Sequence, residues 1–336
     1  MGGQGAAADC GSGLWPLNES LLLYAENSLA ANTKKLYEVG EYKYQELCSK
    51  FKISNPFPAT EHLLCYFAVF LAETVRYDTI RCYFAGLKNQ HLRMGYQLNI
   101  SEFEQLQYVL RGIKRSQGSS TRTRLPITPE HLEMFHDLQQ PEGFNHFDNS
   151  MLWAAICLAY FGFLRGSEFT SDQQFHPGTH LSPADIKLIP SFEEAQYIIV
   201  YLKKSKTDPC GKGTSVTVAR SNSTICAFKA LQLYLTWRKF SEGPLFLFKS
   251  RELLTPQRFT KEIRNLLSKC GQEPNEYASH SFRIGAATAA ANANLPEWII
   301  KTMGRWTSDC YQRYIQKPTT ALSQVSTSLI NDSDRL

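Results

Sequence analysis

The feature that most constrains the fold of this chain is a polar run at residues 116–126, Ser-Gln-Gly-Ser-Ser-Thr-Arg-Thr-Arg-Leu-Pro. The run is rich in Ser, Thr and Gly and has no apolar periodicity, which is typical of a flexible linker. A chain of 336 residues with 43% hydrophobic content can bury a core on each side of it. We therefore predict a leader at 1–15, one domain at 16–115 and a second at 127–336.

Four amphipathic helices are predicted in the first domain. Apolar residues recur at helical spacing in Thr33–Phe51, and Thr60 is placed to open the second helix. Asp78 is expected to cap the third helix, and Ser101 with Glu104 is expected to form a capping box for the fourth. The pattern predicts a small all-helical domain.

The second domain is predicted to be mainly helical with a small sheet. Its first helix starts at Thr128-Pro129-Glu130, with proline at the first helical position. Two stretches rich in β-branched residues, 196–202 and 214–219, form a hairpin through the polar segment 203–213. Further helical patterns occupy 151–164, 224–240, a segment after Pro256, 281–293 and a segment beyond Pro296. The predicted fold class is therefore mainly α with a small β-sheet.

Composition excludes several other classes. The formal charge of +5 permits an anionic partner without indicating one. The nine cysteines are scattered and contain no CxxC pair, which favours reduced intracellular thiols and argues against a metal site. The longest apolar stretch, Met151–Leu164, is too short to span a membrane and is predicted to be a buried helix. No secretory signal pattern opens the chain, so no membrane association is expected.

The first candidate site motif is Tyr160-Phe-Gly-Phe-Leu-Arg165-Gly-Ser-Glu168, which ends the apolar run with an arginine. The guanidinium of Arg165 is expected to emerge at a well-packed helix end. Glu168, three residues later, can hold its planar fork. Standing alone, such a pair is more often an ordinary surface ion pair.

A second motif lies near the C-terminus. It comprises Ser279-His280-Ser-Phe-Arg283, then Gly304-Arg305-Trp306, then Tyr311-Gln-Arg-Tyr314-Ile315. His280 and Arg283 share one face if a helix begins near Ser279. A phenol can attack a phosphodiester when two guanidiniums neutralise the charge that develops and a His or Trp positions the phosphate. The two motifs together supply these groups.

At these residues the chain resembles the tyrosine recombinase (phage-integrase) family, and especially its Cre-like members and the transposon-encoded members of Crypton and DIRS type. The resemblance implies an N-terminal helical core-binding (SAM-like) domain and a C-terminal catalytic domain. It also implies roles. Arg165 with Glu168, His280, Arg283 and Trp306 would bind the scissile phosphate, Lys206 would protonate the leaving oxygen, and Tyr314 would be the nucleophile. No cofactor and no metal is implied.

Two of these assignments have competitors. Lys203 and Lys204 stand beside Lys206 in the same turn and are alternative proton donors. Tyr311 precedes Tyr314 by three residues and is an alternative nucleophile. Measured from Trp306, Tyr314 lies one residue closer than the nucleophile of Cre-like chains does, and Tyr311 closer still.

The expected partner is double-stranded DNA. Arg81 and Lys88 are predicted on outer faces of the first domain, while Arg122 and Arg124 would let the linker follow a phosphate backbone. Arg305 is expected either to contact DNA or to face solvent. The sequence of the linker, with Arg122 and Arg124, fits a solvated connection without DNA contacts equally well.

The resemblance implies a site-specific DNA recombinase that integrates or excises a mobile element through a 3′-phosphotyrosine intermediate. It further implies a homotetramer on two DNA sites, coupled by the apolar tail Thr319–Ile330, and a nuclear site of action. The tail could instead fold back on its own domain. A catalytically silent DNA-binding protein derived from such an enzyme, and a topoisomerase, are the competing functions.

Overall fold

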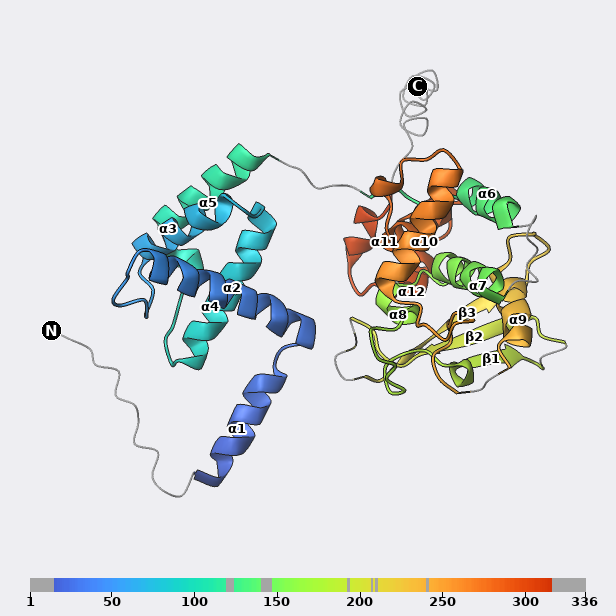
Figure 1. Cartoon of the computed structure of the whole chain (residues 1–336), viewed down its shortest axis with the longest axis horizontal. Coiled ribbons are helices and arrows are strands. Elements are labelled where there is room, and N and C mark those ends of the chain that lie inside the picture. Colours follow the sequence, from blue (N-terminus) through green and yellow to red (C-terminus); the bar gives the residue numbers. More distant parts are fainter. Residues whose placement is uncertain are drawn as a thin grey trace, which may run out of the picture. The chain divides into compact units, whose positions relative to one another are not determined.

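The computed structural model describes residues 15–118, 124–139, 147–191, 194–206, 208, 211–239 and 242–315. The chain divides into two compact units, residues 1–121 and 122–336 (Figure 1). The boundary falls within the polar run at 116–126. The predicted leader, Arg122 and the tail at 319–330 lie wholly or almost wholly outside the described residues.

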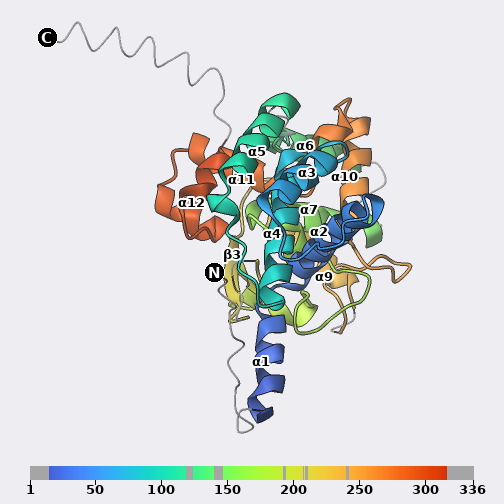
Figure 2. The ribbon, with the colours of Figure 1, turned by 90° about the vertical axis from the view of Figure 1, so that its left-hand side faces the viewer.

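In the described residues of the first unit, helices are the only regular secondary structure. Its elements are α1 (Trp15–Asn27), α2 (Ala31–Lys50), α3 (Glu61–Ala72), α4 (Tyr77–Arg93), the 3₁₀ turn η1 (Ile100–Glu102) and α5 (Glu104–Gln117). Helix α2 packs on α4 and α3 packs on α5, around a core that includes Tyr44, Phe67 and Phe84. The all-helical prediction for these residues is confirmed, with α1 as an additional helix that projects from the other four in both views (Figures 1 and 2).

The predicted helix starts of this unit are partly wrong. Thr60 caps α3 as expected, with its hydroxyl accepting the Leu63 N–H at 3.3 Å. Helix α4 instead begins one residue before Asp78, which lies in its first turn. Ser101 lies in η1, and α5 starts after Phe103 without a capping box.

The start of α5 is satisfied by another helix. Glu61 of α3 accepts the Leu106 N–H at 3.1 Å, so a group distant in sequence takes up one of the donors that the first turn of α5 leaves free.

The second unit is a mainly helical domain with one small sheet, as predicted. Its helices are α6 (Pro129–Gln139), α7 (Phe147–Phe161), α8 (Gly166–Phe169), α9 (Ala227–Trp237), α10 (Pro256–Lys269), α11 (His280–Asn292) and α12 (Glu297–Gly304). Three 3₁₀ turns accompany them, η2 (Pro183–Asp185), η3 (Pro274–Glu276) and η4 (Asp309–Arg313).

The sheet contains β1 (Ile186–Ile189), β2 (Tyr197–Leu202) and β3 (Thr214–Ala219) in the order β1-β2-β3, with both pairings antiparallel. The predicted hairpin corresponds to β2 and β3, in which Val200 pairs with Val216. Strand β1 was not predicted, because four residues give too short an alternation to recognise.

Helix α7 is the centre of this unit. Its residues from Ser150 to Tyr160 are all buried, which confirms the prediction of a buried helix, and it contacts α9 and α11. The helix ends at Phe161 rather than at 164, because Phe163 takes a left-handed backbone conformation with φ of 49°. Among the described helices, none is both long and apolar enough to cross a membrane.

The segment at 124–127 is fastened to the start of α11. The Leu125 N–H donates to the Glu276 carbonyl, and the Ile127 N–H donates to the Ser281 carbonyl, each at 3.0 Å. Gly285 allows this approach, because a Cβ at that position would overlap the Ile127 carbonyl. The segment therefore lies against the helix that carries His280 and Arg283.

We expect Gly285→Ala to destabilise the second unit by about 3 kcal/mol, since a methyl group there must push α11 away from Ile127. Denaturant unfolding measures this loss. The matched control is Gly112→Ala in the middle of α5, where an added Cβ meets nothing within 4 Å. That change is expected to stabilise the protein by roughly 0.5–1 kcal/mol. Equal effects of the two substitutions would contradict the close approach at Gly285.

Candidate catalytic site

Arg165 and Glu168 form the first part of the site, at the turn that follows α7. Arg165 is the N-cap of α8, and its Nη1 donates to Glu168 Oε1 at 2.9 Å. The Arg165 backbone N–H donates to the other carboxylate oxygen at 2.8 Å. The Glu168 side chain is only 1% exposed, so the pair is a buried anchor and not a surface ion pair.

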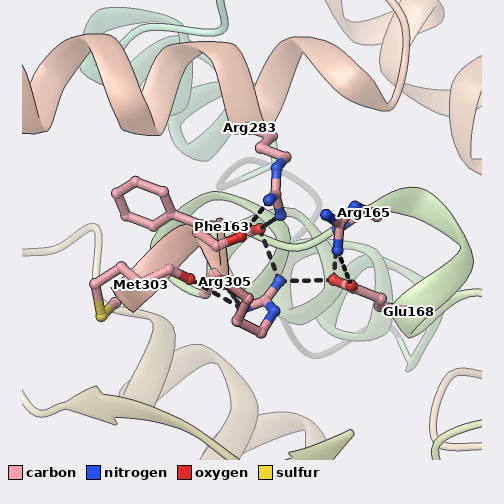
Figure 3. Close-up of polar contacts among 8 residues, drawn as sticks. Phe163, Arg165, Glu168, Arg283, Met303 and Arg305 are labelled. Carbon is pink, nitrogen blue, oxygen red and sulfur yellow. Dashed lines mark hydrogen bonds and ion pairs between the residues drawn. The ribbon is translucent and has the colours of Figure 1, made fainter. Parts of the chain in front are cut away.

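Arg283 enters the site from α11 and is fully buried. Its Nη1 donates to the Phe163 carbonyl at 2.5 Å, and its Nη2 donates to the Gly304 carbonyl (Figure 3). Its Cζ lies 4.3 Å from the centre of the Trp306 ring. The guanidinium is therefore fixed by the turn after α7, the end of α12 and an aromatic face.

The site is a cluster with excess positive charge, in which Glu168 lies among Arg165, Arg283 and Arg305. Burial, followed by the charges of Arg165 and Arg305, lowers the pKa of Arg283 to about 9. That value is still well above neutral pH, so the guanidinium remains charged. Repulsion among arginines in a desolvated place favours the binding of an anion.

His280 is the first residue of α11, which confirms the predicted helix start after Ser279. Its ring centre lies 5.0 Å from that of Tyr314. Partial desolvation, and then the charges of Arg283 and Arg165, lower the pKa of His280. The imidazole is therefore biased toward its neutral form until an anion offsets these charges.

Trp306 and Tyr314 complete the cluster. The ring of Trp306 is 7% exposed and lies 5.1 Å from the Tyr314 ring, centre to centre. Its buried indole N–H has no hydrogen-bond partner within the described residues. The Tyr314 ring also lies 5.9 Å from Arg283 Cζ. An unsatisfied buried donor beside a phenol and a guanidinium is what a phosphate-binding site requires.

Tyr311 occupies a different environment. It is 2% exposed, and its ring lies 6.1 Å from that of Trp306 on the side of α12, where the Lys301 ammonium lies 5.3 Å from it. Desolvation, and then a hydrogen bond with Glu297, raise the pKa of Tyr311. Although both tyrosines belong to the 3₁₀ turn η4 and its C-cap, they lie in different environments, and Tyr314, the preferred nucleophile, is the one whose ring lies beside those of His280 and Trp306.

Lys206 is not brought into this cluster. It is exposed in the connection between β2 and β3, and among the described residues it has no hydrogen bond or ion pair to the other candidates. Its competitor Lys203 is committed elsewhere, because its ammonium pairs with Asp185 at 2.7 Å. Lys204 is exposed like Lys206.

The proposed DNA contacts fall into three groups. Arg81 and Lys88 are exposed on α4, as expected. Arg124 donates to the Asn275 carbonyl at 2.5 Å, so it holds the segment before α6 in place. Arg122 lies outside the described residues.

Arg305 differs from expectation. Its side chain is only 10% exposed, and its guanidinium is turned inward to Glu168 at 2.7 Å instead of outward to solvent. No sequence pattern indicates this ion pair, because the two residues are 137 positions apart. Sequence reasoning also missed the Phe163 and Gly304 carbonyls, which are backbone groups without any residue signature.

The chain is similar to known proteins in sequence and in fold. No family model matches the chain. An integrase/recombinase XerD homolog of Selenomonas ruminantium is 25% identical over 314 residues, which are 89% of this chain and 87% of that protein.

Solved structures share the fold. The Tn1549 transposon integrase in complex with transposon right end DNA has a TM-score of 0.61 at 17% identity, covering 93% of this chain and 98% of that one. The XerH site-specific recombinase bound to a palindromic difH substrate has a TM-score of 0.64 at 15% identity, covering 87% and 78%. A lambda integrase dimer bound to a core site has a TM-score of 0.59 at 11% identity, covering 89% and 94%.

The chain is a two-unit, mainly helical protein whose second unit places buried arginines beside a tyrosine. Its sequence is similar to that of the XerD homolog, and its fold is similar to that of the solved Tn1549 integrase, XerH recombinase and lambda integrase.

The lowered pKa of His280 makes stability depend on pH. The unfolded chain binds a proton near the ordinary value of 6.5, and the folded chain binds it only at lower pH. Between these values the unfolded state holds more protons, so stability is expected to fall as pH is lowered through 6.5. Urea unfolding from pH 8 to pH 5 measures this slope. The slope of His280→Asn should be smaller, and an unchanged slope would contradict the proximity of the arginines.

Proposed function

We propose that this protein is a site-specific DNA recombinase that breaks and rejoins DNA through a covalent tyrosine intermediate. The observation that carries the proposal is the position of Tyr314, whose ring contacts His280, Trp306 and Arg283 together. A phosphate bound among these groups would meet the phenol, two guanidiniums and the unpaired indole N–H. Such preorganised charge supports phosphoryl transfer.

In the cleavage step, the Tyr314 phenolic oxygen attacks a backbone phosphorus atom. A phosphorus–oxygen bond to tyrosine forms, and the bond to the 5′ oxygen of the next nucleotide breaks. His280, biased toward its neutral form, accepts the phenolic proton. Arg165 and Arg283 stabilise the additional negative charge in the transition state, and Glu168 holds Arg165 in place.

The leaving 5′ oxygen requires a proton, and we assign its donor to Lys206. The residue lies exposed in a connection between two strands, from which a long side chain can reach a DNA groove. Lys203 is the weaker candidate because it is paired with Asp185. The free 5′ hydroxyl then returns its proton to Lys206 and attacks a phosphotyrosine on a partner strand. The phosphodiester forms, the bond to Tyr314 breaks, and His280 returns the proton to the phenolic oxygen. Because the ester stores the bond energy, rejoining needs no nucleotide cofactor.

The stoichiometry of this reaction indicates the assembly. Each protomer has one Tyr314 cluster and cleaves one strand, while exchange between two duplexes requires four cleavages. We therefore propose a homotetramer on two DNA sites. Integration or excision of a mobile element would follow from the choice of the two sites.

The subtype and the place of action are further proposals. The Tyr314-Ile315 ending and the Gly304-Arg305-Trp306 motif favour a relative of the Cre-like, Crypton and DIRS recombinases. Such elements act on nuclear DNA, so we propose a nuclear location. Imaging of a fluorescent fusion in cells tests it, and exclusion of the protein from nuclei would contradict it.

Trapping of the covalent intermediate tests the proposed function. The purified full chain is incubated with a pool of nicked duplexes that carry randomised sequence. In these duplexes cleavage near the nick releases a short fragment and prevents religation. Complexes stable to SDS are separated, digested with protease, amplified and selected again. We expect enrichment of a defined target sequence whose adduct is removed by protease and is unaffected by EDTA.

The outcomes distinguish the competing functions. Sequence-selective binding without any adduct after selection would indicate a catalytically silent DNA-binding protein. An adduct that reseals its own strand, with no exchange between two labelled duplexes, would indicate a topoisomerase. Exchange between the two duplexes supports recombination.

A further inference from the structure

Arg305 has an unusual backbone conformation for its residue type. It ends α12 as the C-cap with φ of 54° and ψ of 44°, in the left-handed region that favours glycine. Its N–H donates to the Thr302 carbonyl at 3.0 Å, so it closes the helix. A glycine would close the helix with less strain. The reason for an arginine at this position must therefore lie in the contacts of its guanidinium.

The guanidinium of Arg305 contacts both the turn after α7 and the end of α12. Its Nη2 donates to Glu168 Oε2 at 2.7 Å and to the Phe163 carbonyl at 3.0 Å. Its Nη1 donates to the Gly162 carbonyl at 3.2 Å and to the Met303 carbonyl at 3.0 Å. One side chain thus joins the end of α12 to the turn between α7 and α8 (Figure 3).

Both arginines assigned to phosphate binding depend on the groups that Arg305 holds. Glu168 is shared, because its carboxylate accepts from Arg165 as well as from Arg305. The Phe163 carbonyl is also shared, because it accepts from Arg283 as well as from Arg305. Among the described residues Arg165 and Arg283 share no hydrogen-bond partner, and Arg305 links them through Glu168 and the Phe163 carbonyl.

Arg305 also sets the charge of the cluster. Three guanidiniums surround one carboxylate, which leaves two positive charges in a largely buried place. Each terminal nitrogen of Arg305 donates two hydrogen bonds within the protein, whereas each terminal nitrogen of Arg283 donates one, so Arg305 has no terminal N–H left for a phosphate in this arrangement. Its contribution to phosphate chemistry must pass through its neighbours.

We propose that Arg305 is a positioning residue, which locks Glu168 and the Phe163 carbonyl and thereby fixes Arg165 and Arg283 for attack on the phosphate. The proposal rests on the proposed function, since it concerns the same cleavage step. It predicts a loss in the rate of cleavage without a comparable loss in DNA affinity. A residue that contacted DNA would instead change both the affinity and its salt dependence.

The decisive variant is Arg305→Gly. Glycine suits the left-handed conformation, so a role limited to ending α12 would be preserved or improved. We expect the single-turnover rate of adduct formation on the selected nicked duplex to fall about 100-fold, as when catalytic groups are misplaced by an ångström. The dissociation constant for the same duplex should change less than about threefold, because no direct phosphate contact is removed.

Arg305→Lys is the conservative variant. An ammonium keeps the charge and can reach one acceptor, but it cannot bind Glu168 and the carbonyls as a planar fork does. We expect it to recover part of the rate, leaving a deficit of about 10-fold against the unaltered protein. If Arg305 served only to end α12, lysine would not restore the rate of adduct formation relative to glycine.

Arg251→Gly is the matched control. Arg251 is also an arginine in the left-handed region, with φ of 69°, but it is exposed and lies outside the cluster. Relief of its backbone strain should leave the rate of adduct formation within about twofold of the unaltered protein. The comparison separates the release of strain from the loss of the bridge.

A double-mutant cycle with Glu168→Gln tests the bridge itself. If Arg305 acts through Glu168, the double variant should lose little more rate than the more damaging single variant. Losses that multiply would show that the two residues act independently and would overturn the proposal.

The remaining outcomes are also decisive. A normal rate in Arg305→Gly, or a loss of affinity equal to the loss of rate, contradicts the proposal. Rate losses of both Arg305 variants that match their unfolded fractions by circular dichroism contradict it as well. If the unaltered protein forms no adduct, the proposed function fails instead, and that result is separate from any difference among variants.

Discussion

Tyr314→Phe is expected to abolish the covalent adduct on the selected nicked duplex while leaving DNA binding within about threefold of normal. The substitution removes only the phenolic oxygen, and the ring keeps its contacts with His280 and Trp306. Loss of the nucleophile should reduce adduct formation by at least about 10⁴-fold, to below detection on a denaturing gel.

Tyr311→Phe is the matched control for this result. The two tyrosines are three residues apart, but Tyr311 is buried against Trp306 and lacks a ring contact with His280 in the described structure. Its phenylalanine variant should form adduct at near-normal yield. The reverse pattern would transfer the role of nucleophile to Tyr311.

Arg283→Lys is expected to have the second largest effect. A lysine ammonium cannot reach both the Phe163 and the Gly304 carbonyls from one position in α11. We expect adduct formation to slow about 10²- to 10³-fold, the range found when one charge-stabilising donor is lost. At least one buried hydrogen bond is lost, so stability should fall by about 1–3 kcal/mol.

Arg238→Lys separates these two effects. Arg238 is also buried and donates to two backbone carbonyls, those of Glu242 and Pro244, but it lies outside the cluster. Its lysine variant should lose similar stability and keep a normal rate of adduct formation for each folded molecule. Equal rate losses in both variants would mean that Arg283 acts only through stability.

Much of the fold follows from patterns that local physics determines. Residues 151–160 are apolar on every face, which identified α7 as the buried central helix. Thr255-Pro256 and Thr128-Pro129 mark the starts of α10 and α6, because proline fits the first helical turn. The hairpin of β2 and β3 follows from its β-branched residues and polar connection.

The errors occur where distant groups replace local ones. The predicted capping box at Ser101 does not form, and Glu61 of α3 satisfies the Leu106 N–H in the first turn of α5. The four-residue β1 is stabilised by pairing with β2 and has little pattern of its own. A helix start or a short strand can therefore depend on contacts that no sequence window contains.

The candidate site shows the same division. His280 and Arg283 share α11, and Arg165 and Glu168 share one turn, so spacing alone brought each pair together. The inward turn of Arg305 and the difference between Tyr311 and Tyr314 depend on how the end of α12 and η4 fold back on the cluster. These features require the tertiary structure.

Mapping the attachment point of DNA tests the central claim most directly. The adduct formed by the unaltered protein is digested with nuclease and trypsin, and its peptides are fragmented by mass spectrometry. Cleavage after Arg305 and Arg313 places Tyr311 and Tyr314 in different peptides, 306–313 and one beginning at Tyr314. A nucleotide on Tyr314 is the predicted result. A nucleotide on Tyr311, or on a residue outside η4 and its C-cap, would contradict the account.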